Sequence, residues 1–283
     1  MTFSSIGKQK RLERLLTSGK MIVVPVDDSL ILGPKQGLFN LENTIKGIAS
    51  GKPNAIMGFK LAAEYVVESG YQIPFIYNLT ASTLLSEHTR KTAVLCVENA
   101  LVAGADCVAA HINFSSRYEN EMLCSFSQIA NECDRLGMPL LAIAYPRSER
   151  NGKDYNYEDM IKGNQDAYAE LVAHCVRVVS ELGADIIKTQ YTGSAESFKI
   201  VTASAGKRPV VIAGGPKVSI ETSLKCVAGA IEAGGAGISF GRNIFNADYI
   251  VPYLEAAKSI IFNGYTWHEA ISDYNKVIGE NYG

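Results

Sequence analysis

The feature that most constrains the fold of this chain is the regular alternation of short apolar, β-type runs with segments of helical periodicity. Eight such runs end at intervals of about 31 residues, a spacing that suits a strand followed by a crossover helix. The intervening segments repeat apolar residues every three or four positions, as at Met122, Phe126 and Ile129. The expected strands are 21–26, 55–58, 75–77, 107–111, 140–145, 185–188, 210–213 and 236–240.

Eight β/α units allow two architectures, a doubly wound open sheet and a closed barrel. A dinucleotide-binding open sheet carries a GxGxxG motif after its first strand, and no such motif follows Val26. We therefore predict an α/β fold, a single (β/α)8 TIM barrel, with an N-terminal helix within residues 1–20 capping its bottom and a helical extension over residues 248–283. Because no low-complexity linker interrupts the pattern, residues 1–283 are expected to form one domain.

Composition and charge exclude several classes of protein. With 47% hydrophobic residues and a formal net charge of −2, the chain is neither a disordered protein nor one suited to nucleic acid. It contains no run of the roughly 18 apolar residues that a membrane span needs, and its first twenty residues lack the apolar region of a secretory signal, so we expect a cytoplasmic protein without a membrane partner. The six cysteines and four histidines show no CxxC, HxxH or HxxxH spacing, which favours buried thiols and predicts no metal site.

Lys188 is the most informative single residue for the chemistry of this chain. In a TIM barrel the catalytic groups lie at the carboxyl ends of the strands, and Lys188 ends the apolar run DIIK with the same parity as Ile186. Its side chain is therefore expected in the dry barrel mouth, where desolvation and neighbouring cations lower an amine pKa and make it a nucleophile toward a ketone. The alternatives are a rim lysine in a salt bridge, or Lys60, after the second strand, as the nucleophile.

Glycines follow the seventh and eighth expected strands as Gly214-Gly215 and Gly241-Arg242. TIM barrels commonly bind a phosphate between these two loops, because glycines allow close approach of backbone N–H groups and an arginine adds a charge-assisted hydrogen bond. Loops that merely need a positive φ are the alternative for either pair taken alone. Their occurrence after both strands predicts a phosphate site.

Asp27 and Tyr145, which follow the first strand and end the fifth, are candidate acid–base groups. A carboxylate facing a cationic lysine stays ionised and can accept a proton, and a tyrosine hydroxyl beside a Schiff base can transfer one to or from a substrate oxygen. A capping aspartate and a packed tyrosine are the alternatives. With Lys188 and the phosphate loops, these residues describe the site of a metal-free aldolase that needs no cofactor beyond its own lysine.

The motifs that contain these residues make the resemblance to a known family specific. The stretches VPVDDSLILGP, NLTASTLL, MPLLAIAYPR, GADIIKTQYTG, VVIAGGPK and GISFGRNIF resemble the archaeal-type class I fructose-bisphosphate aldolase family, over about residues 6–250. The resemblance implies Lys188 as the Schiff-base lysine, Tyr145 as the proton donor and Asp27 as the proton acceptor. It also implies a homo-oligomer, often a decamer of barrels. The substrate and phosphate contacts that it implies are Asp27, Asp28, Ser29, Leu30, Ile31, Tyr145, Pro146, Arg147, Gly214, Gly215, Gly241 and Arg242.

Two positions depart from the family's usual pattern. Asp28-Ser29 stands where the family usually has His-Gly, and Ser148 stands where it usually has Gly. The first change places a second carboxylate beside Asp27, where it could raise the pKa of Asp27 by like-charge repulsion or bind a cationic group of the substrate. An amino-bearing acceptor such as aspartate semialdehyde, which the resemblance also implies, would suit the extra carboxylate.

We therefore expect a class I aldolase or transaldolase that acts on a phosphorylated ketose, such as dihydroxyacetone phosphate or a deoxyhexosulose phosphate, and an aldehyde acceptor. The product would be a precursor of an amino sugar or an aminobenzoate. Plain cleavage of fructose bisphosphate to dihydroxyacetone phosphate and glyceraldehyde 3-phosphate is an alternative. A thiolase that uses coenzyme A and a phosphorylated diketone is a second alternative, and a non-enzymatic scaffold is a third.

Overall fold

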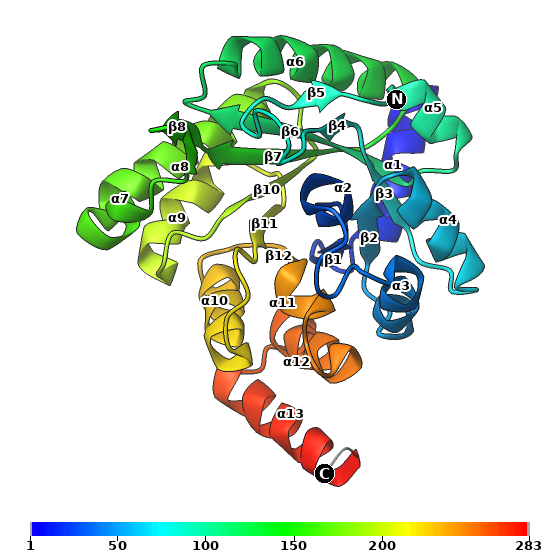
Figure 1. The fold of residues 1–283 in the computed structure, drawn as a ribbon, viewed down its shortest axis with the longest axis vertical. Helices are drawn as coiled ribbons and strands as arrows, with labels where there is room; N and C mark the ends of the chain where they lie inside the picture. Colours follow the sequence, from blue (N-terminus) through cyan, green and yellow to red (C-terminus); the bar gives the residue numbers. More distant parts are fainter. Residues whose placement is uncertain (1, 282–283) are drawn as a thin grey trace.

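The strand β1 (Met21–Pro25) pairs in parallel with both β2 (Ala55–Gly58) and β12 (Gly237–Ser239), which closes an eight-stranded parallel barrel. This computed structural model describes residues 2–281, so Met1, Tyr282 and Gly283 of the expected 1–283 unit lie outside the described residues. The closed parallel barrel with helices around it confirms the predicted TIM-barrel fold (Figure 1). The other barrel strands, in ring order from β12, are β11 (Val210–Ala213), β10 (Ile186–Gln190), β7 (Leu140–Pro146), β6 (Cys107–Phe114) and β3 (Phe75–Asn78).

A helix follows each strand and covers the outside of the barrel (Figure 1). Apolar residues spaced three or four apart place one face of each helix on the sheet, as Val172, Val176 and Val179 do, all of them buried. The covering helices are α3 (Leu41–Ser50), α4 (Lys60–Glu68), α5 (Val97–Val102), α6 (Glu119–Leu136), α8 (Gln165–Glu181), α9 (Ala195–Ser204), α10 (Ile220–Glu232) and α12 (Ile250–Asn263).

The interior of the barrel is a core separate from the one beneath the helices. Inward side chains of successive strands, such as Val23, Met57, Ile143 and Ile186, pack into one buried cluster. Leu15 of the N-terminal helix α1 (Phe3–Leu15) belongs to the same cluster, so α1 caps the barrel at its amino-terminal end, as predicted. At the other terminus, the extension consists of α12 and of α13 (Trp267–Asn281), which points away from the barrel in Figure 1.

Short elements between the strands and the main helices were not predicted. They are the helices α2 (Asp28–Leu32), α7 (Glu158–Gly163) and α11 (Arg242–Phe245), and two antiparallel pairs, β4 (Thr80–Ala81) with β5 (Thr92–Ala93) and β8 (Ser148–Arg150) with β9 (Lys153–Tyr155). Their segments are only two to six residues long, too short to show a hydrophobic period, so the sequence pattern does not distinguish them from loops. All follow barrel strands, and residues from several of them line the mouth of the barrel.

β10 continues two residues beyond its expected end at Lys188. The Thr189 hydroxyl donates to the Ala144 carbonyl at 2.8 Å, and Gln190 accepts a hydrogen bond of 2.6 Å from the Tyr168 hydroxyl. These bonds keep the two polar residues in the strand, so Lys188 lies within β10. Within residues 2–281, no helix is long and apolar enough to cross a membrane.

Candidate active site

A cavity of about 640 Å³ opens at the carboxyl ends of the barrel strands. Its lining includes the three residues predicted to be catalytic, Asp27, Tyr145 and Lys188. They come from the end of β1, from β7 and from β10, and so converge only because the barrel closes. A concave site with a few polar groups at this end of the fold is the expected place for TIM-barrel chemistry.

Lys188 is a nearly buried lysine in the wall of this cavity. In the register of the sheet it lies between Ile143 of β7 and Val211 of β11, both of which point into the barrel core. Its parity matches that of Ile186, one layer deeper, and only 7% of its surface is exposed. The amine is thus held at the boundary between the apolar interior and the cavity, where a bound carbonyl group could reach it.

Asp27 is held by an amide from a third strand. Asn78, the last residue of β3 and 2% exposed, donates from Nδ2 to Oδ2 of Asp27 at 3.0 Å. Asn78 Oδ1 in turn accepts the backbone N–H and the hydroxyl of Thr80, which fixes the orientation of the amide. Asn78 was not predicted as a site residue, although its place at the end of the third strand is the signal that could have identified it.

Asp28 follows Asp27 and begins α2. Burial raises the pKa of the Asp28 carboxyl, and the adjacent Asp27 carboxylate raises it further, whereas Arg242, Lys188 and Arg147 oppose these two effects. The side chain lies 3.5 Å from Arg242 Nε. The second carboxylate therefore joins the end of β1 to the predicted phosphate loop after β12.

The ring of Tyr145 packs against an aromatic ring and a cationic group. The ring of His111, from β6, meets it edge-on with centroids 5.0 Å apart, and the Arg147 guanidinium lies 5.5 Å from its centroid. Burial raises the pKa of the Tyr145 phenol, against the opposing charge and hydrogen bond of Lys188. The hydroxyl is consequently protonated at neutral pH and placed to act as an acid beside Lys188.

The two glycine loops are tied together by Asn243, which sequence reasoning missed. This buried side chain accepts from the Val218 N–H at 2.9 Å and donates to the carbonyls of Gly214 at 2.7 Å and Pro216 at 3.2 Å. A Cβ on Gly214 would lie only 2.9 Å from Asn243 Nδ2, so the close approach requires glycine. The asparagine in the loop after the eighth strand was the available signal.

The remaining residues predicted to bind substrate divide into two groups. Asp28, Ile31, Arg147, Gly214, Gly215, Gly241 and Arg242 all line the cavity. Ser29 and Leu30 instead line a separate hollow of about 580 Å³, because they lie on another face of the short helix α2. Pro146 belongs to β7 and is not among the lining residues. Lys60, the competing lysine, begins α4 and is exposed.

A second lysine, Lys91, also lines the cavity, and no sequence pattern singles it out. It is the last residue of the loop between β4 and β5 and is 5% exposed. The pKa of Lys91 is lowered to about 7. Burial has the largest effect and Arg147 acts in the same direction, whereas Asp27, Asp154 and Asp28 oppose them. No group of three or more His, Cys, Asp or Glu residues within the described chain is arranged to hold a metal ion.

Comparison with known proteins places this chain in a family. Residues 21–247 match the family model described as DeoC/LacD family aldolase. The chain is 36% identical to 2-amino-3,7-dideoxy-D-threo-hept-6-ulosonate synthase of Halobacterium salinarum over 240 residues, which are 84% of this chain and 85% of that protein. It is 34% identical to 2-amino-3,7-dideoxy-D-threo-hept-6-ulosonate synthase 1 of Archaeoglobus fulgidus over 280 residues, covering 98% of this chain and all of the relative.

A solved structure of an archaeal fructose-1,6-bisphosphate aldolase, with its catalytic lysine covalently bound to the carbinolamine intermediate of the substrate, is similar throughout. Its TM-score is 0.76 at 27% identity, and the match covers 90% of this chain and 99% of that one. These findings confirm the resemblance drawn from the sequence motifs. The chain belongs to the DeoC/LacD aldolase family.

Proposed function

We propose that this chain is a class I aldolase or transaldolase in which Lys188 forms a Schiff base with a phosphorylated ketose. The observation that carries the proposal is the placement of Lys188, nearly buried within the barrel strand β10 and hydrogen-bonded to Tyr145, in the cavity that Tyr145 and Asp27 also line. The loops of Gly214-Gly215 and Gly241-Arg242, joined by Asn243, are suited to the phosphate.

The reaction begins when the neutral amine of Lys188 attacks the ketone carbon of the substrate. Loss of water from the resulting carbinolamine gives an iminium, which withdraws electrons from the neighbouring carbon–carbon bond. When that bond breaks, its electron pair forms an enamine on Lys188 and an aldehyde leaves. The enamine then attacks the carbonyl carbon of an acceptor aldehyde, and water hydrolyses the new iminium to release the product and free the lysine.

Tyr145 and Asp27 move the protons of this sequence. The Tyr145 phenol, held in its protonated form by burial, donates to the oxygen that leaves as water and can donate to the alkoxide of the new bond. The Asp27 carboxylate accepts the hydroxyl proton when the carbon–carbon bond breaks, and Asn78 fixes the direction of its Oδ2 lone pairs. No metal or organic cofactor enters this mechanism.

The acceptor is an aldehyde that carries an α-amino acid group, such as aspartate semialdehyde. Two relatives are named for a 2-amino heptulosonate, and an acceptor of this kind would provide the amino and carboxylate groups of such a product. The product would serve as a precursor of an amino sugar or an aminobenzoate. Asp28, an extra carboxylate in the cavity, can face the substrate ammonium.

Substrate assays test this proposal against its two alternatives. The enzyme is offered a deoxyhexosulose phosphate with aspartate semialdehyde, fructose bisphosphate alone, and a phosphorylated diketone with coenzyme A. The proposal expects a seven-carbon amino keto acid from the first assay and a much lower rate in the second. Faster cleavage of fructose bisphosphate would instead support the plain aldolase. The similarity to the solved archaeal fructose-1,6-bisphosphate aldolase is the observation that favours this alternative. Formation of acetyl-coenzyme A would indicate the thiolase.

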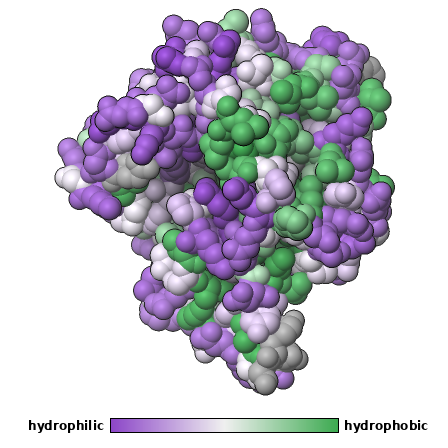
Figure 2. All heavy atoms as spheres, in the orientation of Figure 1, coloured by the Kyte–Doolittle hydropathy of each residue, from purple (hydrophilic) through white to green (hydrophobic). Residues whose placement is uncertain are grey.

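The chain is proposed to work as a homo-oligomer in the cytoplasm, and a decamer is the assembly implied by the family resemblance. Apolar side chains gather on the face of the molecule around α2 in Figure 2. Phe39, which lines the hollow that Ser29 and Leu30 also line, is 82% exposed, and Leu85 is 97% exposed. All six cysteines are free thiols, as expected in a reducing compartment. Light scattering on the eluting peak of a sizing column gives the subunit number, and a mass of one chain would contradict the assembly.

A further inference from the structure

A group of nitrogen-bearing side chains lines the cavity on the side opposite the phosphate loops. The glycine loops follow β11 and β12, and in the ring order of the barrel the strands across from these two are β3 and β6. The opposite group comes from these strands and from β7, and it belongs to the same cavity. It consists of His88 and Lys91 after β3, His111 on β6 and Arg147 after β7.

We propose that Lys91 and Arg147, with His88 and Ser82 positioning them, form a binding site for the carboxylate of the acceptor aldehyde. The inference rests on the proposed function, because it assigns one end of the second substrate of that reaction. The phosphate of the ketose and the carboxylate of the acceptor are then held at opposite walls of the barrel mouth, and Lys188 and Tyr145 lie on the strands between them.

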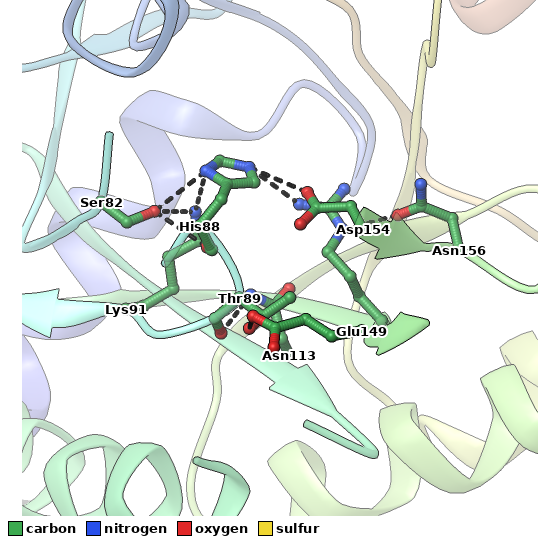
Figure 3. Close-up of polar contacts among 9 residues, drawn as sticks. Ser82, His88, Thr89, Lys91, Asn113, Glu149, Asp154 and Asn156 are labelled. Atoms are coloured by element: carbon green, nitrogen blue, oxygen red, sulfur yellow. Dashed lines mark hydrogen bonds and ion pairs between the residues drawn. The ribbon is translucent and has the colours of Figure 1, made fainter. Parts of the chain in front are cut away.

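The site is built before any substrate arrives. Lys91 Nζ donates to Ser82 Oγ at 2.6 Å (Figure 3). Arg147 Nε donates to Asn156 Oδ1 at 2.6 Å. The guanidinium Nη1 of Arg147 lies 3.3 Å from His88 Nε2, within hydrogen-bond distance of the ring. Because both cations are fixed by neutral partners, their charge is not cancelled by those bonds.

His88 is a neutral imidazole between the two cations. Burial, Lys91 and Arg147 lower the pKa of His88 to about 3, so the imidazole is neutral at pH 7. Its Nε2 faces the Arg147 guanidinium, and its Nδ1 lies 3.1 Å from Ser82 Oγ and 3.5 Å from Lys91 Nζ. The serine hydroxyl itself donates to the His88 carbonyl at 3.0 Å. His88 is therefore a positioning residue that joins the two cations.

The loop that carries this group is fastened to the barrel. β4 and β5 pair at its two ends, and Asn113 Nδ2 of β6 donates to the Thr89 carbonyl at 2.8 Å. The Thr89 hydroxyl donates to Glu149 of β8 at 2.6 Å, which links the loop to the second hairpin (Figure 3). These contacts restrain the loop of residues 82–91 between β4 and β5. Because the loop is already ordered, binding of the anion costs little conformational entropy.

The charge of the group suits a carboxylate better than a phosphate. Lys91 and Arg147 supply at most two positive charges, and the Asp154 carboxylate already lies 3.7 Å from His88 Nε2. A second negative charge on the ligand would be repelled by Asp154 and by the nearby Asp27 and Asp28, whereas one negative charge is attracted by both cations. His111 adds a neutral polar atom, since its buried Nε2 has no hydrogen-bond partner among the described residues.

Lys91→Met tests the assignment with three acceptor aldehydes: aspartate semialdehyde and succinate semialdehyde, which carry a carboxylate, and butanal, which carries none. We expect the KM for both carboxylate aldehydes to rise about tenfold or more, with kcat/KM for butanal within about twofold of the native value. Lys153→Met, the same change at an exposed lysine of the β8–β9 hairpin, should leave all three values unchanged. Equal losses with butanal and with the semialdehydes would overturn the proposal.

The native enzyme provides a test that does not depend on a variant folding. Lys91 faces Asp27 and Asp28 after β1, His111 on β6, Arg147 after β7, Asp154 on β9 and His88 on its own loop. Burial and Arg147 lower the pKa of Lys91 to about 7, against the opposing charges of Asp27, Asp154 and Asp28. The ratio of kcat/KM for succinate semialdehyde to that for butanal cancels the pH dependence of the steps that the two acceptors share. We expect this ratio to fall as the pH rises through 7, because the Lys91 amine loses its charge. A ratio independent of pH between 6 and 9 would contradict the site.

A fourth acceptor distinguishes the carboxylate from a phosphate. If glyceraldehyde 3-phosphate is used better than either semialdehyde, and if Lys91→Met raises only its KM, the site binds phosphate and the carboxylate assignment is wrong. Borohydride trapping of the ketose at Lys188 in the Lys91→Met enzyme separates this failure from failure of the proposed function. Trapping that persists shows that the Schiff-base mechanism stands whatever the acceptor kinetics show.

Discussion

The amide of Asn78 donates a hydrogen bond of 3.0 Å to the carboxylate of Asp27, joining the end of β3 to the end of β1 across the intervening strand β2. The bond occupies one oxygen of the proposed base and leaves the other for substrate. Asn78 itself is anchored through Thr80, so the orientation of the carboxylate is determined by a side chain that never needs to touch the substrate. Support of this kind keeps a catalytic group within the narrow range of geometry that reaction requires.

Asn78→Ala should therefore lower kcat about tenfold to a hundredfold and change the KM for the ketose little, because Asp27 loses its orientation and not its charge. Steady-state kinetics with saturating ketose phosphate measure the effect. Thr80→Val, which removes a donor to Asn78 and leaves the Asn78–Asp27 bond in place, is the matched control and should cost less activity. A rise in KM with native kcat would show that Asn78 acts in binding instead.

Tyr145→Phe should reduce kcat by about 100-fold or more, because the change removes a general acid, and it should leave the fold intact, because the ring keeps its contact with His111. Since burial raises the pKa of the phenol, no loss of activity on the alkaline side is expected from Tyr145 below its ordinary value near 10. Rapid-quench kinetics with Lys188 trapping would separate the steps. A Phe variant of native rate would exclude the tyrosine as the acid.

Asn243→Ala should weaken both phosphate binding and the fold. The change leaves the Val218 N–H and the Gly214 carbonyl, which are only partly buried, without their partner, and it frees the loops that are proposed to hold phosphate. We expect the KM for the ketose phosphate to rise at least tenfold, with a fall in the denaturant midpoint. Asn246, in the same loop, offers a control as Asn246→Ala, for which the KM should stay near its native value. An unchanged KM in the Asn243 variant would place the phosphate elsewhere.

Asp28→Asn tests the extra carboxylate in two ways. Folding raises the pKa of Asp28, so its ionised form is destabilised in the folded state at every pH above that pKa, and the penalty vanishes as the pH falls below the unfolded value near 4. The variant should therefore be more stable than the native enzyme at pH 7 and no more stable at pH 3.5, as urea titrations would show. The loss of the ion pair with Arg242 reduces this gain.

The same position should control the choice of acceptor. Asp28→His restores the residue that the family usually carries, and it replaces an anion that can face the substrate ammonium with an imidazole. We expect the preference for aspartate semialdehyde over succinate semialdehyde, which lacks the amino group, to fall severalfold. An unchanged preference would remove Asp28 from acceptor recognition.

The sequence predicted the barrel because its strands and helices have strong and different periods, and the ends of those strands contain Asp27, Tyr145, Lys188 and the glycine loops. It did not predict Lys91 or His88, because their burial depends on how a polar loop folds over the mouth. Ser29 and Leu30 were predicted to bind substrate because they lie next to Asp27 and Asp28 in the sequence motif. The short helix α2 places them on another face, so they do not line the cavity. Asn78 and Asn243 act on distant segments through single hydrogen bonds, which no local pattern reports.

The central claim is that Lys188, and not the equally buried Lys91, forms the Schiff base. The most direct measurement is reduction with borohydride in the presence of dihydroxyacetone phosphate or a longer ketose phosphate, followed by peptide mass mapping. We predict a single stable adduct on the peptide that contains Lys188, with the same adduct in the Lys91→Met enzyme and none in the Lys188→Met enzyme. An adduct on Lys91, or no adduct with any ketose phosphate, would contradict the account.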